Sequence, residues 1–222
     1  MVQDTTRCTV IGSKGLRVAT VEHLLAALFL KNFWYGLVVE VEGPELPILD
    51  GSAQEWLALL ERFQPQPVTL VGLGEPVRIA KNGGEVSAEP ADEFTLAVTV
   101  AFPHPKIGYQ SFASPPETLS SVATARTFGF LKDLEALRSQ GLAHGASLDN
   151  TLVFSENSFL NPPRFPDEPV RHKALDFLGD LYLAGAPFAG RFTVHRGSHR
   201  LHLELAKVLE LRAGERLASK AG

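Results

Sequence analysis

The sequence predicts an α+β fold of two domains, each a β-sheet layered with α-helices, with helices sandwiched between the sheets. The early part of the chain has patterns typical of a strand, a helix, two strands and a helix in that order. A longer version of the same order follows. Between the two sets lies Gln64-Pro65-Gln66-Pro67, a polar stretch with prolines directly after a predicted helix, which is typical of a domain boundary. We therefore expect a first domain over residues 1–66 and a second over residues 67–222.

The composition is that of an ordinary globular protein and narrows the choice of partners. The 222 residues carry a formal charge of −4, which gives no reason to expect nucleic acid or an anionic membrane surface as a partner. The single cysteine, Cys8, excludes an internal disulfide and a cysteine-rich zinc site, and suits a reducing cytoplasm. The longest apolar run, residues 24–30, is too short to span a bilayer, and no signal-peptide pattern precedes it. Any metal site must therefore use histidines and carboxylates.

In the first domain the pattern predicts short strands around two helices. Residues 8–11 are expected to form a strand, and Thr20 is placed to cap a helix whose apolar residues recur at helical spacing. Residues 35–41 are rich in valine and leucine and predict a buried strand. Ser52 follows a tight turn and is placed to cap a helix over residues 53–63.

In the second domain Asn82-Gly83-Gly84 predicts a hairpin turn between two short strands. A long strand is expected over residues 94–102, and a proline-opened helix after Ser114. The remaining expected elements are a helix over 131–140 that ends at Gly141, strands over 151–155 and 190–195, and a helix over 201–211 with His199 at its entry.

The helix after Pro166 carries the first sign of a functional site. Asp167 is placed to cap it, and its first turn tolerates Pro169. His172, Asp176 and Asp180 follow at four-residue steps and so lie on one face. A histidine and a carboxylate one turn apart can bind one metal ion, but the same spacing also fits a solvated polar face with a weak ion pair. The spacing leaves both alternatives open.

Six motifs follow one another along the chain, and together they indicate a family. They are Thr20-Val21-Glu22-His23-Leu24, Leu46-Pro47-Ile48-Leu49-Asp50-Gly51-Ser52-Ala53, Ala125-Arg126-Thr127-Phe128-Gly129-Phe130, Ser147-Leu148-Asp149-Asn150, Phe165-Pro166-Asp167-Glu168-Pro169-Val170-Arg171-His172-Lys173 and Leu175-Asp176-Phe177-Leu178-Gly179-Asp180-Leu181. This ordered set resembles the UDP-3-O-acyl-N-acetylglucosamine deacetylases, the zinc amidases of lipid A biosynthesis. The resemblance runs from about residue 7 to residue 209, and the ordered set is far more specific than any single motif.

The resemblance implies a catalytic zinc ion, Zn²⁺, bound by His23, His172 and Asp176, with a fourth position open. It implies that Glu22 is the general base that takes a proton from water. It also implies that His199 acts from the opposite side, as general acid or as the positive partner of the oxyanion. Without the resemblance, His23 and Glu22 would be interpreted as a half-buried histidine and a favourable first-turn charge.

The same resemblance gives roles to four further residues. Asp180 would orient and charge His199, while Thr127 and Lys173 would stabilise the tetrahedral intermediate and the substrate. Phe128, Thr127 and Lys173 are the expected substrate-binding residues. The expected substrate is a UDP-linked acylated amino sugar, and the products are acetate and the free amine.

The sequence departs from the family pattern at its start. The family has more chain before the point where this sequence begins, so we expect a shortened first domain with an open sheet edge and a tendency to self-associate. An alternative function follows, namely a shortened homologue with reduced or no deacetylase activity that binds metal or ligand in a regulatory role. The family's acyl passage is expected in an insertion around residues 125–153, with residues 130–142 as its candidate helix.

A second departure surrounds the expected acid. The family usually has Ser-Gly-His there, whereas this chain has Gly197-Ser198-His199. Arg200 follows directly, and a cation beside His199 is expected to oppose its protonation. His195 and His202 are near in sequence and remain alternatives for the acid.

Overall fold

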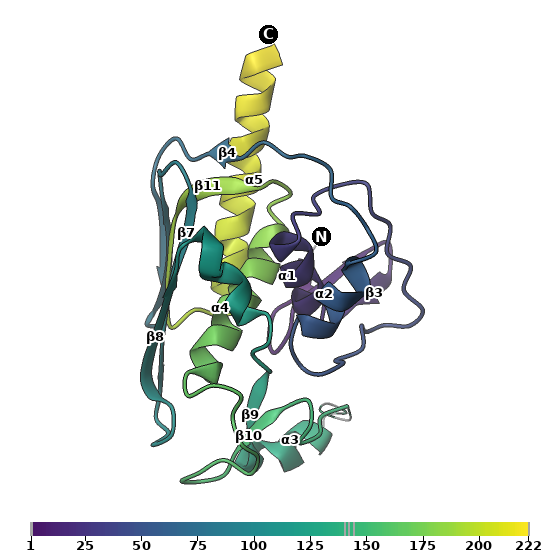
Figure 1. Cartoon of the computed structure of the whole chain (residues 1–222), viewed down its shortest axis with the longest axis vertical. Helices are drawn as coiled ribbons and strands as arrows, with labels where there is room; N and C mark the ends of the chain where they lie inside the picture. The colour runs from purple at the N-terminus through teal and green to yellow at the C-terminus, as the bar shows by residue number, and fades with distance from the viewer. Residues whose placement is uncertain (1, 140, 142, 144, 222) are drawn as a thin grey trace.

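A computed structural model of the chain describes residues 2–139, 141, 143 and 145–221. Helices α1 (Glu22–Leu30), α4 (Glu168–Tyr182) and α5 (His199–Ala221) occupy its middle layer. The larger sheet covers one side of this layer, and the smaller sheet lies with α2 (Gln54–Leu60) on the other side (Figure 1). The expected α+β fold, with helices between sheets, is confirmed. The division at residues 66 and 67 stays a prediction.

The larger sheet has the strand order β5-β6-β11-β7-β8. Its strands are β5 (Val77–Lys81), β6 (Gly84–Glu89), β7 (Phe94–Phe102), β8 (Gly108–Ser114) and β11 (Phe188–His195), and β4 (Val71–Gly72) also pairs with β11. Strand β11, the last strand in the chain, runs parallel to β7 and antiparallel to β6 and so lies between two earlier strands. Buried and partly exposed residues alternate along β7, and the buried Phe192 of β11 contacts Phe177 of α4.

The smaller sheet contains β1 (Val2–Asp4), β2 (Val10–Ser13) and β3 (Leu16–Val18), all antiparallel. Helix α1 follows it and crosses α4 at very short range. A Cβ atom on Gly179 would lie 2.1 Å from the carbonyl oxygen of Glu22, so this crossing requires glycine. The crossing brings Glu22 and His23 close to the polar stripe of α4.

A small lobe beside α4 contains β9 (Phe128–Phe130), η2 (Leu131–Asp133), α3 (Leu134–Ser139) and β10 (Leu152–Phe154), at the bottom of Figure 1. Strands β9 and β10 pair in parallel. In place of the single helix expected over residues 131–140, the structure has a 3₁₀ turn followed by a short α-helix. Gln140 and Leu142 lie outside the described residues. Gly141 has φ +73°, as expected of a residue that ends a helix.

Two predictions for the first domain are wrong. Residues 35–41, all of which the structure describes, form no strand, and Val38 is 85% exposed. Their apolar composition predicted burial, but burial needs a neighbouring strand, which local composition cannot supply. Thr20 does not cap α1, because its φ is +59° and its hydroxyl donates to Glu45 (2.6 Å). Exposed apolar side chains such as that of Val38 are typical of surfaces that associate. Self-association of the chain stays a prediction, which sedimentation measurements of its molecular mass would test.

Most other elements lie where the pattern places them. The hairpin at Asn82 and the strand over 94–102 are confirmed. The helix after Ser52 is shorter than expected, and the helix after Ser114 is the 3₁₀ helix η1 (Pro116–Val122). Strand β8 lies between β7 and η1 in the chain and pairs antiparallel with β7 along its whole length.

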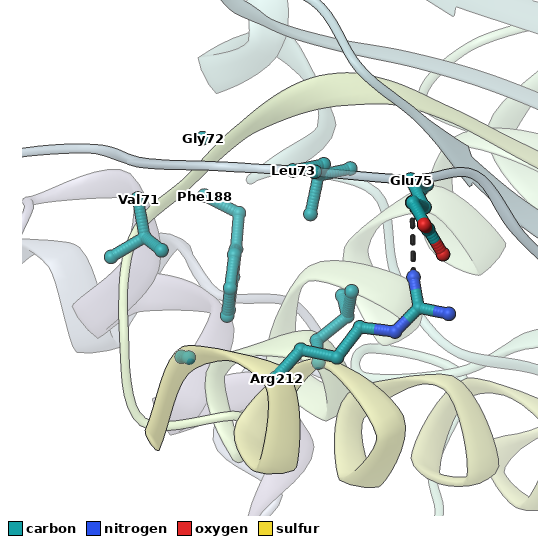
Figure 2. A pocket seen from close by; sticks show the side chains of 9 residues that line it. Val71, Gly72, Leu73, Glu75, Phe188 and Arg212 are labelled. Carbon is teal, nitrogen blue, oxygen red and sulfur yellow. Dashed lines mark hydrogen bonds between the residues drawn. The ribbon is translucent and has the colours of Figure 1, made fainter. Parts of the chain in front are cut away.

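A cavity of about 350 Å³ lies between β4, β11 and α5 (Figure 2). Arg212 crosses it and donates to the backbone oxygen of Glu75 (3.0 Å). None of the expected active-site residues lines this cavity. Within the described chain, no helix has the length and apolar character to cross a membrane.

Candidate active site

The polar stripe of α4 is buried. His172 and Asp176 are each 2% exposed and Asp180 is 0% exposed, so the interpretation as a solvated face is wrong. Asp167 occupies the N-cap position and Pro169 the first turn, but the Asp167 carboxylate accepts from Arg171 (2.8 Å) instead of capping the helix. Burial of two carboxylates and a histidine on one helix face needs partners, because unpaired buried charges are costly.

His23, His172 and Asp176 come together as one group. Nε2 of His172 lies 3.3 Å from Oδ1 of Asp176, and Nε2 of His23 lies 4.0 Å from the same oxygen. The three ligand atoms lie within 4.8 Å of one another. Ligands at the corners of a zinc tetrahedron are about 3.3 Å apart, so small shifts would bring all three into range.

The protonation states of these residues also suit a divalent cation. Nδ1 of His172 donates to the carbonyl oxygen of Ala125 (3.0 Å), which leaves Nε2 with a free lone pair. Burial, with the nearby His172, lowers the pKa of His23 to about 3, so the imidazole is neutral. Burial opposes charge on Asp176, but His172 and Lys173 outweigh it and hold the pKa of this carboxyl well below its usual range. Two neutral imidazoles and a carboxylate are a suitable donor set for such an ion.

Lys173 and the loop before β9 border this group. Nζ of Lys173 donates to Oδ2 of Asp176 (2.7 Å) and lies 5.6 Å from the centre of the Phe128 ring. Burial disfavours the ammonium, but Asp176 outweighs that effect and raises the pKa of Lys173, so it stays charged. Thr127 is fixed in the loop because its backbone N–H donates to the carbonyl oxygen of Gly51 (2.7 Å).

A buried ion pair fixes this loop to the start of α4. The Glu168 carboxylate accepts from the backbone N–H and the Nε of Arg126 (2.9 and 3.0 Å) and from the backbone N–H of Arg164 (2.7 Å). Glu168 is 0% exposed, so these donors are what make its burial tolerable. The sequence analysis missed this pair, because no local pattern connects residues 42 positions apart.

Glu22 lies at the start of α1 and is 4% exposed. Its Oε2 accepts a hydrogen bond from the backbone N–H of Thr9 (3.0 Å). Burial raises the pKa of Glu22 to about 7, with Asp176 and Asp180 adding to the effect and His199 opposing it. A carboxylate with this pKa can both take up and release a proton near neutral pH.

His199, the first residue of α5, and Asp180 of α4 form a close pair. Nδ1 of His199 donates to Oδ2 of Asp180 (2.8 Å). Burial alone would lower the pKa of His199, but the Asp180 carboxylate raises it to about 9. Arg200 is exposed and pairs with Glu204 (3.1 Å), so the expectation that it opposes protonation of His199 is not supported by its position.

The two alternative histidines have different positions. His195 is exposed on β11 and contacts Thr99 (2.7 Å), away from Asp180. His202 is 1% exposed and shares the Asp180 carboxylate with His199 (2.8 Å). Sequence reasoning missed Thr9, whose hydroxyl donates to the other oxygen of Asp180 (2.5 Å).

Comparison with known proteins agrees with this geometry. The family model of UDP-3-O-acyl N-acetylglycosamine deacetylase matches residues 1–210. A protein from Thermosynechococcus vestitus is 46% identical in an alignment of 215 positions that covers 94% of this chain and 75% of the relative. Relatives from Nitratidesulfovibrio vulgaris and Myxococcus xanthus are 43% and 42% identical, over 91% and 93% of this chain and 68% of each relative. All three are named UDP-3-O-acyl-N-acetylglucosamine deacetylase. This chain therefore belongs to the UDP-3-O-acyl N-acetylglycosamine deacetylase family.

Proposed function

We propose that the protein is a zinc-dependent deacetylase that hydrolyses the N-acetyl group of UDP-3-O-acyl-N-acetylglucosamine in the cytoplasm, as a step of lipid A biosynthesis. The observation that carries the proposal is the convergence of a buried His–His–Asp group with a carboxylate of raised pKa and a charged His–Asp pair. Family membership and the names of the relatives support the same reaction.

In this proposal His23, His172 and Asp176 hold the zinc ion. Bound there, zinc supplies Lewis acidity towards the acetamide carbonyl and lowers the pKa of a water molecule. Glu22 accepts the proton of the attacking water, for which a pKa near the working pH is favourable. Its hydrogen bond from Thr9 fixes one carboxylate oxygen and leaves the other for this exchange.

His199 delivers a proton to the amine as it leaves, and Asp180 keeps the imidazole charged until then. The ammonium of Lys173 and the hydroxyl of Thr127 stabilise the negative oxygen that forms on the acetyl carbon. Phe128 lies beside both Lys173 and His172 and supplies an apolar contact for the sugar. The lobe that contains β9, α3 and β10 is the proposed place for the acyl chain.

A deacetylation assay tests the proposal directly. Zinc-loaded protein should release acetate from UDP-3-O-acyl-N-acetylglucosamine, and a chelator should abolish the release until zinc is restored. Zinc binding without acetate release would instead support the regulatory homologue. The chain covers 68–75% of the length of these relatives.

Replacing Asp180 should change the pH profile in a defined direction. A rate that needs protonated His199 is present below the pKa of His199 and lost as the pH rises through it, here about 9. Asp180→Asn removes the anion that raises this pKa, so the basic limb should move down by ~1 unit. The measurement is kcat/KM as a function of pH. The acidic and basic limbs of this profile belong to a coupled site and not to single residues. Arg200→Ala is the matched control, and an unmoved basic limb in Asp180→Asn would exclude His199 as the acid.

A further inference from the structure

The Asp180 carboxylate is shared by donors from two other parts of the chain. Its Oδ1 accepts from the hydroxyl of Thr9, next to β2, at 2.5 Å. Its Oδ2 accepts from Nδ1 of His199 and from Nδ1 of His202, both at 2.8 Å and both in the first turn of α5. Asp180 is 0% exposed, so these groups take the place of water around its charge. His199, the proposed acid, therefore shares the Asp180 carboxylate with two other donors.

The hydrogen bonding of His202 fixes its tautomer. Its Nε2 is buried and has no hydrogen-bond partner among the described residues, whereas its Nδ1 faces a carboxylate. The proton must then lie on Nδ1, because a carboxylate accepts and does not donate. Burial lowers the pKa of His202, so the ring stays neutral while it donates.

The neighbours of His202 hold the ring in this position. The ring packs edge-on against Phe177 with centroids 5.2 Å apart. A Cβ atom on residue 197 would lie 2.4 Å from Nε2, so Gly197 is what lets the ring approach the backbone there. The ring thus has little freedom to turn away from Asp180.

We propose that His202 is a positioning residue for the deacetylase reaction, which fixes the Asp180 carboxylate and shares its negative charge with His199. This inference rests on the proposed function of His199 and deepens it. A neutral donor stabilises the carboxylate more when His199 is neutral than when the imidazolium already compensates the charge. His202 therefore limits how strongly Asp180 favours the imidazolium.

Other charged groups also act on His199, and they stay unchanged in the test. Asp176 on α4 favours its protonation and Lys173 on α4 opposes it. Glu22 on α1 interacts with it electrostatically, and the hydroxyl of Thr9 lies 3.3 Å from its Nδ1. A change confined to His202 can therefore be assigned to the shared oxygen.

The test compares His202→Leu with His202→Asn in the zinc-loaded protein. Leucine has similar bulk but no donor, so the pKa of His199 and the basic limb of the pH profile should rise by ~0.5 unit. This direction is opposite to that expected for Asp180→Asn. Asparagine carries an N–H donor on its δ atom, where His202 has Nδ1, and should leave both values within error of the original protein.

Two measurements are needed, because the activity depends on the proposed function and the pKa does not. The pKa of His199 is followed by ¹⁵N NMR of histidine-labelled protein, with its signal assigned through His199→Gln. The pH profile of kcat/KM is measured on the same samples. Arg200→Ala, a change in the same turn at an exposed side chain, is the control and should shift neither value.

The outcomes distinguish the positioning role of His202 from the proposed deacetylase function. A raised His199 pKa in His202→Leu, restored in His202→Asn, supports the inference even if the protein does not release acetate. An unchanged or lowered pKa in His202→Leu overturns it. If His202→Leu fails to fold, His202→Ala takes its place, and failure of both to fold while His202→Asn folds would show a structural role and also overturn the inference.

Discussion

Glu22→Gln is expected to keep the metal and lose ~10²–10⁴-fold in kcat. The amide cannot accept a proton from water, so the proposed base is removed. Its oxygen can still accept the hydrogen bond from the backbone N–H of Thr9 (3.0 Å), so the local fold should persist. Glu22 is outside the His–His–Asp group, and metal content should remain near one ion per chain. The measurements are kcat and metal content by elemental analysis.

Glu55→Gln is the matched control for this variant. Glu55 is also an acidic residue in the first turn of a helix, but it is exposed and lies on α2. It should have the activity of the original protein. Activity of Glu22→Gln within tenfold of that value would contradict the assignment of Glu22 as the base, whereas loss of metal in this variant would move Glu22 into the group of ligands.

His172→Ala is expected to lose most of its zinc and, with it, the deacetylase activity. Loss of an outer hydrogen-bond partner typically costs 10–100-fold in metal affinity, so loss of a ligand should cost at least ~100-fold. His23→Ala should behave in the same way, since its Nε2 faces the same Asp176 oxygen. Zinc titration by calorimetry measures the affinity without reference to turnover.

The control for both histidine variants is His195→Ala, because His195 is exposed and contacts Thr99 outside the group. It should bind zinc as the original protein does. Full zinc affinity in both His172→Ala and His23→Ala would remove the basis for the proposed metal site. Loss in one variant alone would limit the ligand assignment to that histidine.

Local patterns in the sequence were sufficient for much of the fold. The hairpin turn at Asn82 needs two successive residues with positive φ, and asparagine followed by glycine is the usual solution. The strand over 94–102 and the helix after Pro166 follow from period-2 and helical spacing. The prediction failed at residues 35–41, because whether an apolar stretch is buried depends on what else packs against it.

The sequence by itself determined the family and the candidate site residues, because it contains six motifs in a fixed order and the ordered set is far more specific than any single motif. The tertiary structure alone decided that the α4 stripe is buried, that Arg126 and Glu168 form an ion pair, and that Asp180 is shared between His199, His202 and Thr9. Thr9 and Asp180 are 171 positions apart, and Gly179, next to Asp180, lets the start of α1 approach α4. Local spacing sets which residues share a helix face, whereas the pKa values of the proposed base and acid come from burial and from charges that only folding brings near.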